Sequence, residues 1–193
     1  MALDFSTNGY ENLFRQALAN GINLFCGAGF SVEAMDRKGQ ALPIGAALLK
    51  ELQEEFPAIK PYKKLPRACT KLLQTDKGSF YTFLETRFAV DTFSDLYKAL
   101  LDINIKNIYT TNIDDLFFKL YETSDRISYL INKSLRGSEY VPTTESAHRN
   151  QVNYFPLHGC VRAPKEYVFG ATEIASAFSQ KNSQNSWASL GLV

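Results

Sequence analysis

The sequence is poor in cysteine, and this scarcity excludes several kinds of site. Only three cysteines occur in 193 residues, Cys26, Cys69 and Cys160, and no two of them form a C-x-x-C pair. Neither a structural zinc site nor a disulfide framework is indicated, and we expect no bound metal. Scattered thiols are typical of a reducing compartment, so we expect a cytoplasmic protein.

Excess charge and long apolar runs are also lacking. The formal net charge is +1, so no field of the whole molecule favours nucleic acid or anionic lipid. No run is long and apolar enough to span a bilayer, and residues 1–7 do not have the basic and apolar regions of a signal peptide. Apolar residues make up 45% of the chain, enough for the core of one globular domain over residues 1–193.

The chain's most informative stretch is the apolar run over residues 22–26, which stops at Gly27-Ala28-Gly29-Phe30-Ser31. An apolar run of this length bounded by glycine predicts a buried strand of an α/β sheet. Because glycine has no Cβ, this turn can adopt left-handed backbone, and a ligand can approach it closely. A helix after the turn would direct its free N–H groups at a phosphate. A tight turn that binds nothing fits the same residues.

Apolar periodicity predicts the remaining elements. The expected helices cover residues 8–20, 44–56, 66–73, 80–88, a stretch from 92, 116–121 and 172–178. The expected strands after the first cover residues 107–111, 126–131, 153–157 and 167–169. Residues 32–42 are expected to form a helical turn and a loop able to cover a ligand, and residues 133–151 a long polar loop.

Two of these helices carry apolar stripes that we expect to be buried. The stripe of the first helix is Tyr10, Leu13, Phe14, Ala17 and Leu18, and the helix from Thr92 is expected to bury Phe93, Leu96 and Leu100. Strands alternating with helices predict an α/β, Rossmann-like fold: a mainly parallel sheet with helices on both faces. A helical insert, about residues 44–101, separates its first two strands.

Polar or glycine chemistry follows three of the expected strands: residues 27–31, residues 111–115, and His158-Gly159. In parallel sheets the ligand crevice lies at the carboxyl ends of the strands, so these residues are expected to converge. Each also has a plainer interpretation. Asn112 and Asp115 can cap the following helix, and His158 can be a hydrogen-bonded core histidine.

In this order the three segments resemble the sirtuin (SIR2) family. The matching residues are Gly27, Ala28, Gly29 and Ser31 of G-A-G-x-S; Thr110 or Thr111 with Asn112, Ile113 and Asp114 of T-x-N-x-D; and Leu157, His158 and Gly159 of L-H-G. The resemblance covers about residues 21–172. Thr111 stands where deacetylases of the family usually have Gln.

Departures from the family pattern indicate the branch. The zinc ribbon of two C-x-x-C pairs is missing, and residues 35–40 replace the G-I-P-D-F-R stretch of protein deacylases. Leu130-Ile131-Asn132 is similar to a later adenosine-contacting segment of the family, but it precedes His158 and is interpreted as strand and turn. The helical insert and Leu42-Pro43 ahead of a helix are similar to SIR2-like NADases of bacterial anti-phage systems, the Thoeris and defence-associated sirtuin types.

That resemblance implies an NAD+ glycohydrolase, which converts NAD+ to nicotinamide and ADP-ribose and depletes cellular NAD in abortive infection. It implies His158 as general base, Asn112 as the group that orients the ribose or the attacking water, and Asp114 as the residue that holds the carboxamide. The implied NAD-binding set is Gly27, Ala28, Gly29, Phe30, Ser31, Thr111, Asn112, Ile113 and Asp114.

Other functions remain open at this level. One is a module that senses NAD or ADP-ribose without cleaving it, and another is an NAD-dependent deacylase or ADP-ribosyltransferase. A G-T-S/N-type loop of the family has no obvious copy after His158, so we expect either the N-terminal part of a longer protein or a pocket completed by a partner. Control of such an effector leads us to expect a homo-oligomer or a complex with a sensor subunit.

Overall fold

The computed structural model describes residues 8–123, 129–132, 151–162 and 167. Its α-helices are α1 (Asn8–Asn20), α2 (Gly45–Glu55), α3 (Leu65–Thr75), α4 (Lys77–Arg87) and α5 (Leu116–Glu122). Its strands are β1 (Ile22–Cys26), β2 (Ala34–Asp36), β3 (Val90–Phe93), β4 (Ile105–Thr110), β5 (Tyr129–Asn132) and β6 (Gln151–Pro156). Short 3₁₀ helices cover Ala28–Ser31, Pro57–Ile59 and Asp95–Asp102.

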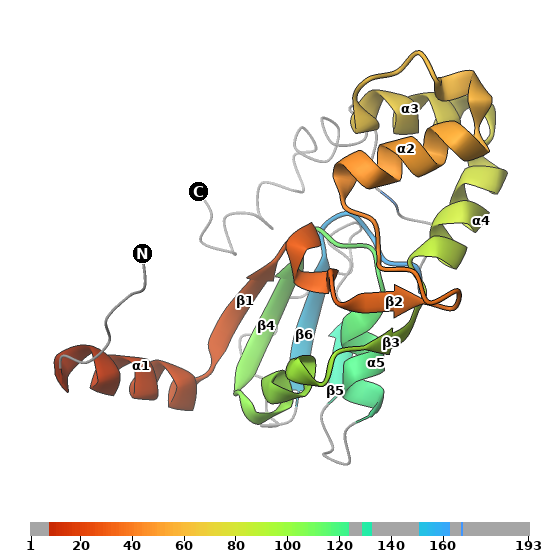
Figure 1. Ribbon diagram of the computed structural model, residues 1–193. Helices are drawn as coiled ribbons and strands as arrows, with labels where there is room; N and C mark the ends of the chain where they lie inside the picture. Colours follow the sequence, from red (N-terminus) through yellow and green to blue (C-terminus); the bar gives the residue numbers. More distant parts are fainter. Residues whose placement is uncertain (1–7, 124–128, 133–150, 163–166, 168–193) are drawn as a thin grey trace.

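A small parallel sheet forms the centre of the described chain (Figure 1). Its strand order is β1-β4-β6-β5, and every neighbouring pair is parallel. Leu24, Ile108 and Tyr154 lie side by side across three of the strands. The protein is therefore a mixed α/β fold, compatible with the Rossmann-like arrangement expected from the sequence.

Helix α5 and the segment Asp95–Asp102 contribute to the core on one face of this sheet. Ile108 and Tyr154 are at most 1% exposed there and pack with Phe117 of α5. Phe117 also stacks on Phe30, with ring centroids 5.0 Å apart. Alternation along the strands places these apolar side chains on one face, and their burial anchors the turn after β1.

The insert between β1 and β4 contains the expected helices α2, α3 and α4. They lie beyond the carboxyl ends of the parallel strands (Figure 1) and have a core of their own. Leu52, Phe80 and Leu84 are fully buried in that core, and Leu72 is 2% exposed. The helices expected over residues 44–56, 66–73 and 80–88 are therefore confirmed.

The insert also contains a second sheet, which the sequence analysis did not predict. Strands β2 and β3 pair antiparallel, with Ala34 opposite Phe93 and Met35 opposite Thr92. The expected helix from Thr92 is wrong, because Thr92 and Phe93 end a strand and only a 3₁₀ helix follows. Leu96 is 75% exposed instead of buried. Pairing between distant segments satisfies the strand backbone, and this outweighs the local helical spacing.

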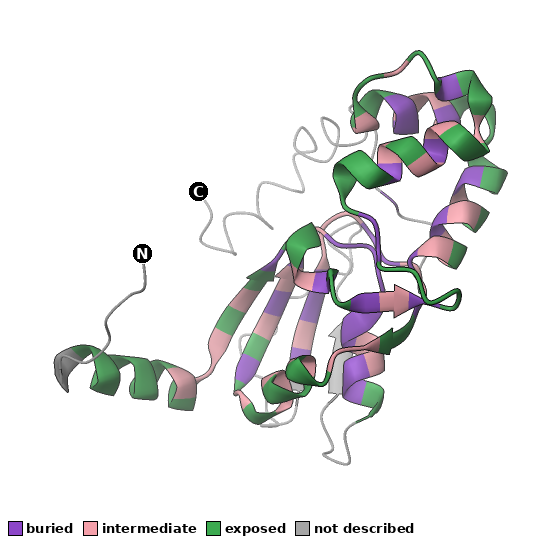
Figure 2. Cartoon of the chain, viewed as in Figure 1, coloured by how far each residue is buried: buried purple, intermediate pink, exposed green. Residues whose placement is uncertain are grey.

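Helix α1 forms as expected, but its apolar stripe is not buried. Tyr10, Leu13 and Phe14 are 64%, 63% and 56% exposed, and the helix extends away from the sheet (Figure 2). Gly21 ends the helix with φ +86°, and a Cβ there would lie 2.8 Å from the side chain of Lys106. The periodicity predicted the helix correctly, but the burial that it implied is wrong.

The remaining expectations fall partly beyond the described ranges. The strand expected at 126–131 corresponds to β5, and the one at 153–157 to β6, which begins two residues earlier. The expected loop at 133–151 (except Gln151, which begins β6), the strand at 167–169 (except Tyr167) and the helix at 172–178 lie outside the described residues. None of the helices in the described ranges has the length and apolar character needed to cross a bilayer.

Candidate functional site

The segments that follow β1, β4 and β6 meet at one edge of the sheet. The N–H of Thr111 donates to the carbonyl of Cys26 at 3.1 Å, and the N–H of Leu157 donates to the carbonyl of Thr110 at 2.8 Å. Hydrogen bonding thus continues past the last residues of the strands. Parallel strands bring their carboxyl ends together in this way, as expected for the three motifs.

A cavity of about 190 Å³ lies between these strand ends and the helical insert. The segments after the strands contribute Ala28, Ser31, Thr111, Asn112, Ile113, Asp114 and His158. The helical insert and the loop directly before it contribute an apolar wall of Leu42, Pro43, Gly45, Leu48, Leu65 and Phe88. The two residues expected to be catalytic, Asn112 and His158, therefore line the same cavity.

Ser31 lies at the centre of the polar contacts in this cavity. The amide nitrogen of Asn112 donates to Ser31 Oγ at 2.9 Å, and the Ser31 hydroxyl is hydrogen-bonded to the Asp114 carboxylate. All three residues are at most 9% exposed. Their bonds form a chain that fixes the orientation of the Asn112 amide, with its nitrogen directed at Ser31.

Asp114 is a buried carboxyl whose ionisation is disfavoured. Burial raises its pKa from 3.8 to about 6, while the hydrogen bonds from Ser31 and from the backbone of Leu116 oppose this shift. The Leu116 N–H donates to Asp114 Oδ1 at 3.1 Å. Asp114 therefore holds the first turn of α5 while also lining the cavity.

His158 is half-buried and lies in the turn after β6. Burial lowers the pKa of His158 below 6.5, and a hydrogen bond to the backbone of Thr111 opposes this effect. The lowered pKa favours the uncharged imidazole, which is the form that can accept a proton. Gly159 has φ +89°, a conformation that glycine adopts without strain, so the glycine of L-H-G is needed for the turn itself.

The glycine turn after β1 differs from the expectation. Gly27 has φ −123°, and neither Gly27 nor Gly29 adopts the left-handed backbone that glycine would allow there. The helix that follows is a 3₁₀ segment of only four residues, too short for the expected phosphate site at a helix N-terminus. Of the five residues 27–31, the cavity is lined by Ala28 and Ser31. Phe30 packs instead against Phe117 and Tyr97.

Asp115 has a structural role that differs from the expected helix cap. It stands at the N-cap position of α5, but its side chain makes no capping bond. Its carboxylate accepts from the Val90 N–H at 2.7 Å and from Arg162 Nε at 3.2 Å. Arg162 also pairs with Glu122 and lies over the Phe118 ring, 4.9 Å from its centroid. No sequence pattern pointed to Arg162.

Within the described ranges, no group of three or more His, Cys, Asp or Glu side chains is arranged to hold a metal ion. The polar side chains that line the cavity carry one amide, two hydroxyls, one carboxyl and one imidazole, a set suited to hydrogen bonding and proton transfer. No protein-family model matches the chain. No curated protein matches it either.

Proposed function

We propose that the protein is an NAD+ glycohydrolase of Rossmann-like fold, acting at the carboxyl ends of β1, β4 and β6. The observation that carries this proposal is the convergence of Asn112 and His158 on one cavity with Ser31 and Asp114. These groups come from three motifs that are distant in the sequence and that resemble the SIR2 family. The resemblance supplies the substrate, and the cavity supplies groups suited to the reaction.

The reaction requires one proton acceptor and little acid catalysis. Water oxygen forms a bond to C1′ of the nicotinamide ribose, and the bond from C1′ to the nicotinamide nitrogen breaks. Its electron pair goes to the ring nitrogen, so the pyridinium leaves as neutral nicotinamide. His158 accepts the proton that the water loses, and general-base help of this kind is worth about 10²–10⁴-fold.

The remaining polar groups position the substrate. Because the Asn112 nitrogen donates to Ser31, its carbonyl oxygen is the atom that can accept a hydrogen bond from the ribose or the water. Asp114 is the residue proposed to hold the carboxamide. A cavity of about 190 Å³ is smaller than the ~300–1,000 Å³ of typical ligand pockets. We therefore assign to it the reacting end of NAD+ and not the whole dinucleotide.

The test is nicotinamide release from NAD+ by the purified protein and by two variants. We expect His158→Ala and Asn112→Ala to lower kcat at least about 100-fold, the scale of a lost general base. His148→Ala, at the chain's other histidine, is the matched control and should retain activity. Unchanged turnover in either site variant would remove the mechanism.

A second candidate is a module that binds NAD or ADP-ribose without cleaving it. The observation that favours it is the burial of Asn112, whose amide already bonds to Ser31. Because the Asn112 amide is already hydrogen-bonded to Ser31, it is less free to move with the substrate during a reaction. Calorimetric binding of ADP-ribose with no nicotinamide released would support this candidate.

The wider biological role belongs to the same proposal. We assign the activity to NAD depletion in the cytoplasm during anti-phage defence, controlled by homo-oligomerisation or by a sensor subunit. Deacylation or ADP-ribosyl transfer is the weaker alternative, since the zinc ribbon of deacylases is missing. Transfer of label from NAD+ to a peptide would favour that alternative over hydrolysis.

A further inference from the structure

We infer that Arg87 is a positioning residue that holds the apolar wall of the candidate cavity in place. This inference rests on the proposed function for its substrate. Arg87 does not line the cavity itself. It ends α4, directly before Phe88, which does line the cavity.

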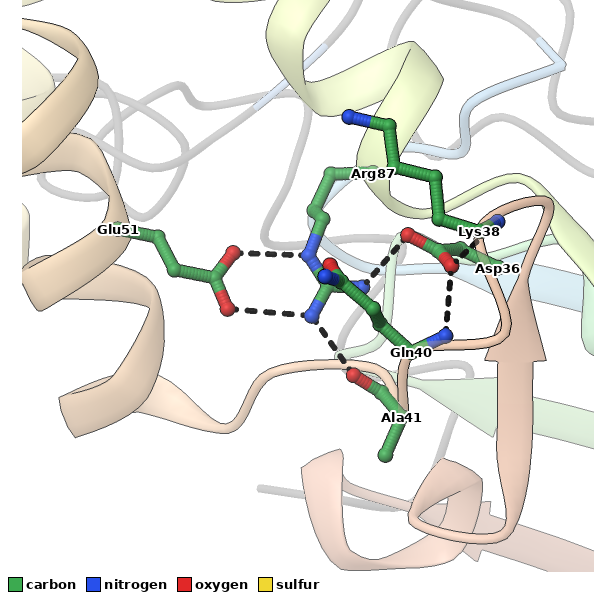
Figure 3. A network of polar contacts seen from close by, with 6 residues as sticks. All are labelled: Asp36, Lys38, Gln40, Ala41, Glu51 and Arg87. Atoms are coloured by element: carbon green, nitrogen blue, oxygen red, sulfur yellow. Dashed lines mark hydrogen bonds and ion pairs between the residues drawn. The ribbon is translucent and has the colours of Figure 1, made fainter.

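The Arg87 guanidinium binds three separate segments at once (Figure 3). Nε and Nη2 donate to the Glu51 carboxylate at 2.8 and 3.1 Å, so this pair is bidentate. Nη1 donates to Asp36 Oδ2 at 3.2 Å, and Nη2 donates to the Ala41 carbonyl at 2.7 Å. A planar fork of five donors can satisfy such a set, whereas an ammonium group cannot match its geometry.

Two of the three partners adjoin a piece of the wall. The Ala41 carbonyl directly precedes Leu42 and Pro43, and Glu51 lies one turn after Leu48 on α2. Leu42, Pro43 and Leu48 all line the cavity. Arg87 therefore connects the loop, α2 and the end of α4 behind the wall that they form.

Asp36 also stabilises the loop that carries Ala41. Its Oδ1 accepts the N–H groups of Lys38 and Gln40, both at 2.9 Å, which closes the turn between β2 and Ala41. The side chains of Asp36 and Arg87 are only 3% and 11% exposed. Separating a charge pair with so little exposure leaves an unpaired buried charge, which is costly, so we expect this pair to stay formed.

The experiment compares Arg87→Lys and Glu51→Gln with the matched control Arg15→Lys. Arg15 makes a similar two-nitrogen contact with Glu11, at 3.0 and 2.7 Å, but on the exposed surface of α1. Glu51→Gln is the milder variant, because Glu51 is 31% exposed and the amide keeps one acceptor oxygen. Two readouts are used: amide hydrogen exchange by segment, and nicotinamide release at varied NAD+.

We expect exchange over residues 41–48 to become about tenfold faster in both site variants, while residues 105–110 of β4 stay unchanged. We expect KM to rise about tenfold with kcat within about threefold, because the wall contacts the ground and transition states alike. Arg15→Lys should change neither quantity.

The inference is overturned if residues 41–48 exchange as in the wild type, or if protection falls equally in β4. It is also overturned if KM stays within about twofold of an active wild type. If the wild type releases no nicotinamide, the proposed function fails. The exchange measurement then still decides whether Arg87 holds the wall.

Discussion

Replacing Asp114 by Asn tests the buried carboxyl of the cavity through the pH dependence of stability. Asp114 is 4% exposed, and burial raises its pKa from 3.8 to about 6. One unit of pKa difference between the folded and unfolded chain corresponds to about 1.4 kcal/mol. The shift of about two units therefore corresponds to roughly 3 kcal/mol of unfolding free energy.

The sign of this effect follows from where the proton is held. Between about pH 4 and pH 6 the folded protein keeps the Asp114 proton that the unfolded chain has already released. The contribution of Asp114 to the unfolding free energy therefore falls as pH rises through this window, and it is constant above it. The amide that replaces the carboxyl in Asp114→Asn does not titrate, so the variant lacks this contribution.

The assay is urea unfolding of the wild type and of Asp114→Asn from pH 3.5 to pH 8. The wild-type value minus the variant value should fall by roughly 3 kcal/mol between pH 4 and pH 6. Asp95→Asn is the control, because Asp95 is exposed and its hydrogen bond to Lys98 lowers its pKa. For Asp95, the wild-type value minus the variant value should instead rise with pH, and it should do so over a lower pH range than for Asp114. A flat or rising difference for Asp114 would refute the reasoning.

Two further predictions concern the glycine turn and the proposed base. Gly29→Ala should change the unfolding free energy by less than about 0.5 kcal/mol, because a Cβ there meets nothing within 4 Å. If the substrate approaches this backbone, the same variant should raise the KM for NAD+. Gly78→Ala, equally open on α4, should leave KM unchanged. On the acid side, the pH profile of kcat/KM should have its midpoint below pH 6.5, since burial lowers the pKa of His158. This decrease at low pH should persist in Asp114→Asn. A midpoint above pH 6.5 would contradict His158 as the base.

The central strands could be predicted because their signals are local. The run from Ile22 to Cys26 is apolar, has strand length and ends at a glycine, and β1 has these bounds in the structure. Strand β4 begins at Ile105, two residues before its expected start, and its apolar pattern continues to Thr110. The burial expected for the first run is wrong, because β1 lies at the edge of the described sheet, and Phe25 is 60% exposed.

The second sheet could not be predicted because its signal is not local. Phe93, Leu96 and Leu100 have helical spacing, but Phe93 pairs with Ala34, 59 positions earlier in the chain. The same limit explains the wrong burial of α1. Its stripe shows which face is apolar, and no periodicity shows whether another part of the molecule covers that face.

The sequence predicted one part of the candidate site and missed another. The rule that parallel strands end at one edge correctly brought Asn112 and His158 to one cavity. Ser31 was expected in the NAD-binding set, but no sequence pattern indicated that it joins Asn112 to Asp114. Arg87 carried no signal at all, since its partners lie 36 to 51 positions away.

The cavity combines two kinds of surface that come from different parts of the chain. Its polar atoms lie on segments fixed by the parallel sheet, where neighbouring strands are about 4.8 Å apart whatever the sequence distance between them. Its apolar wall belongs to the insert, whose position depends on side-chain contacts such as those of Arg87 with Glu51 and Asp36. Changes in the insert can therefore alter what the cavity binds without moving Asn112 or His158. Substrate affinity and proton transfer should accordingly respond to separate sets of substitutions.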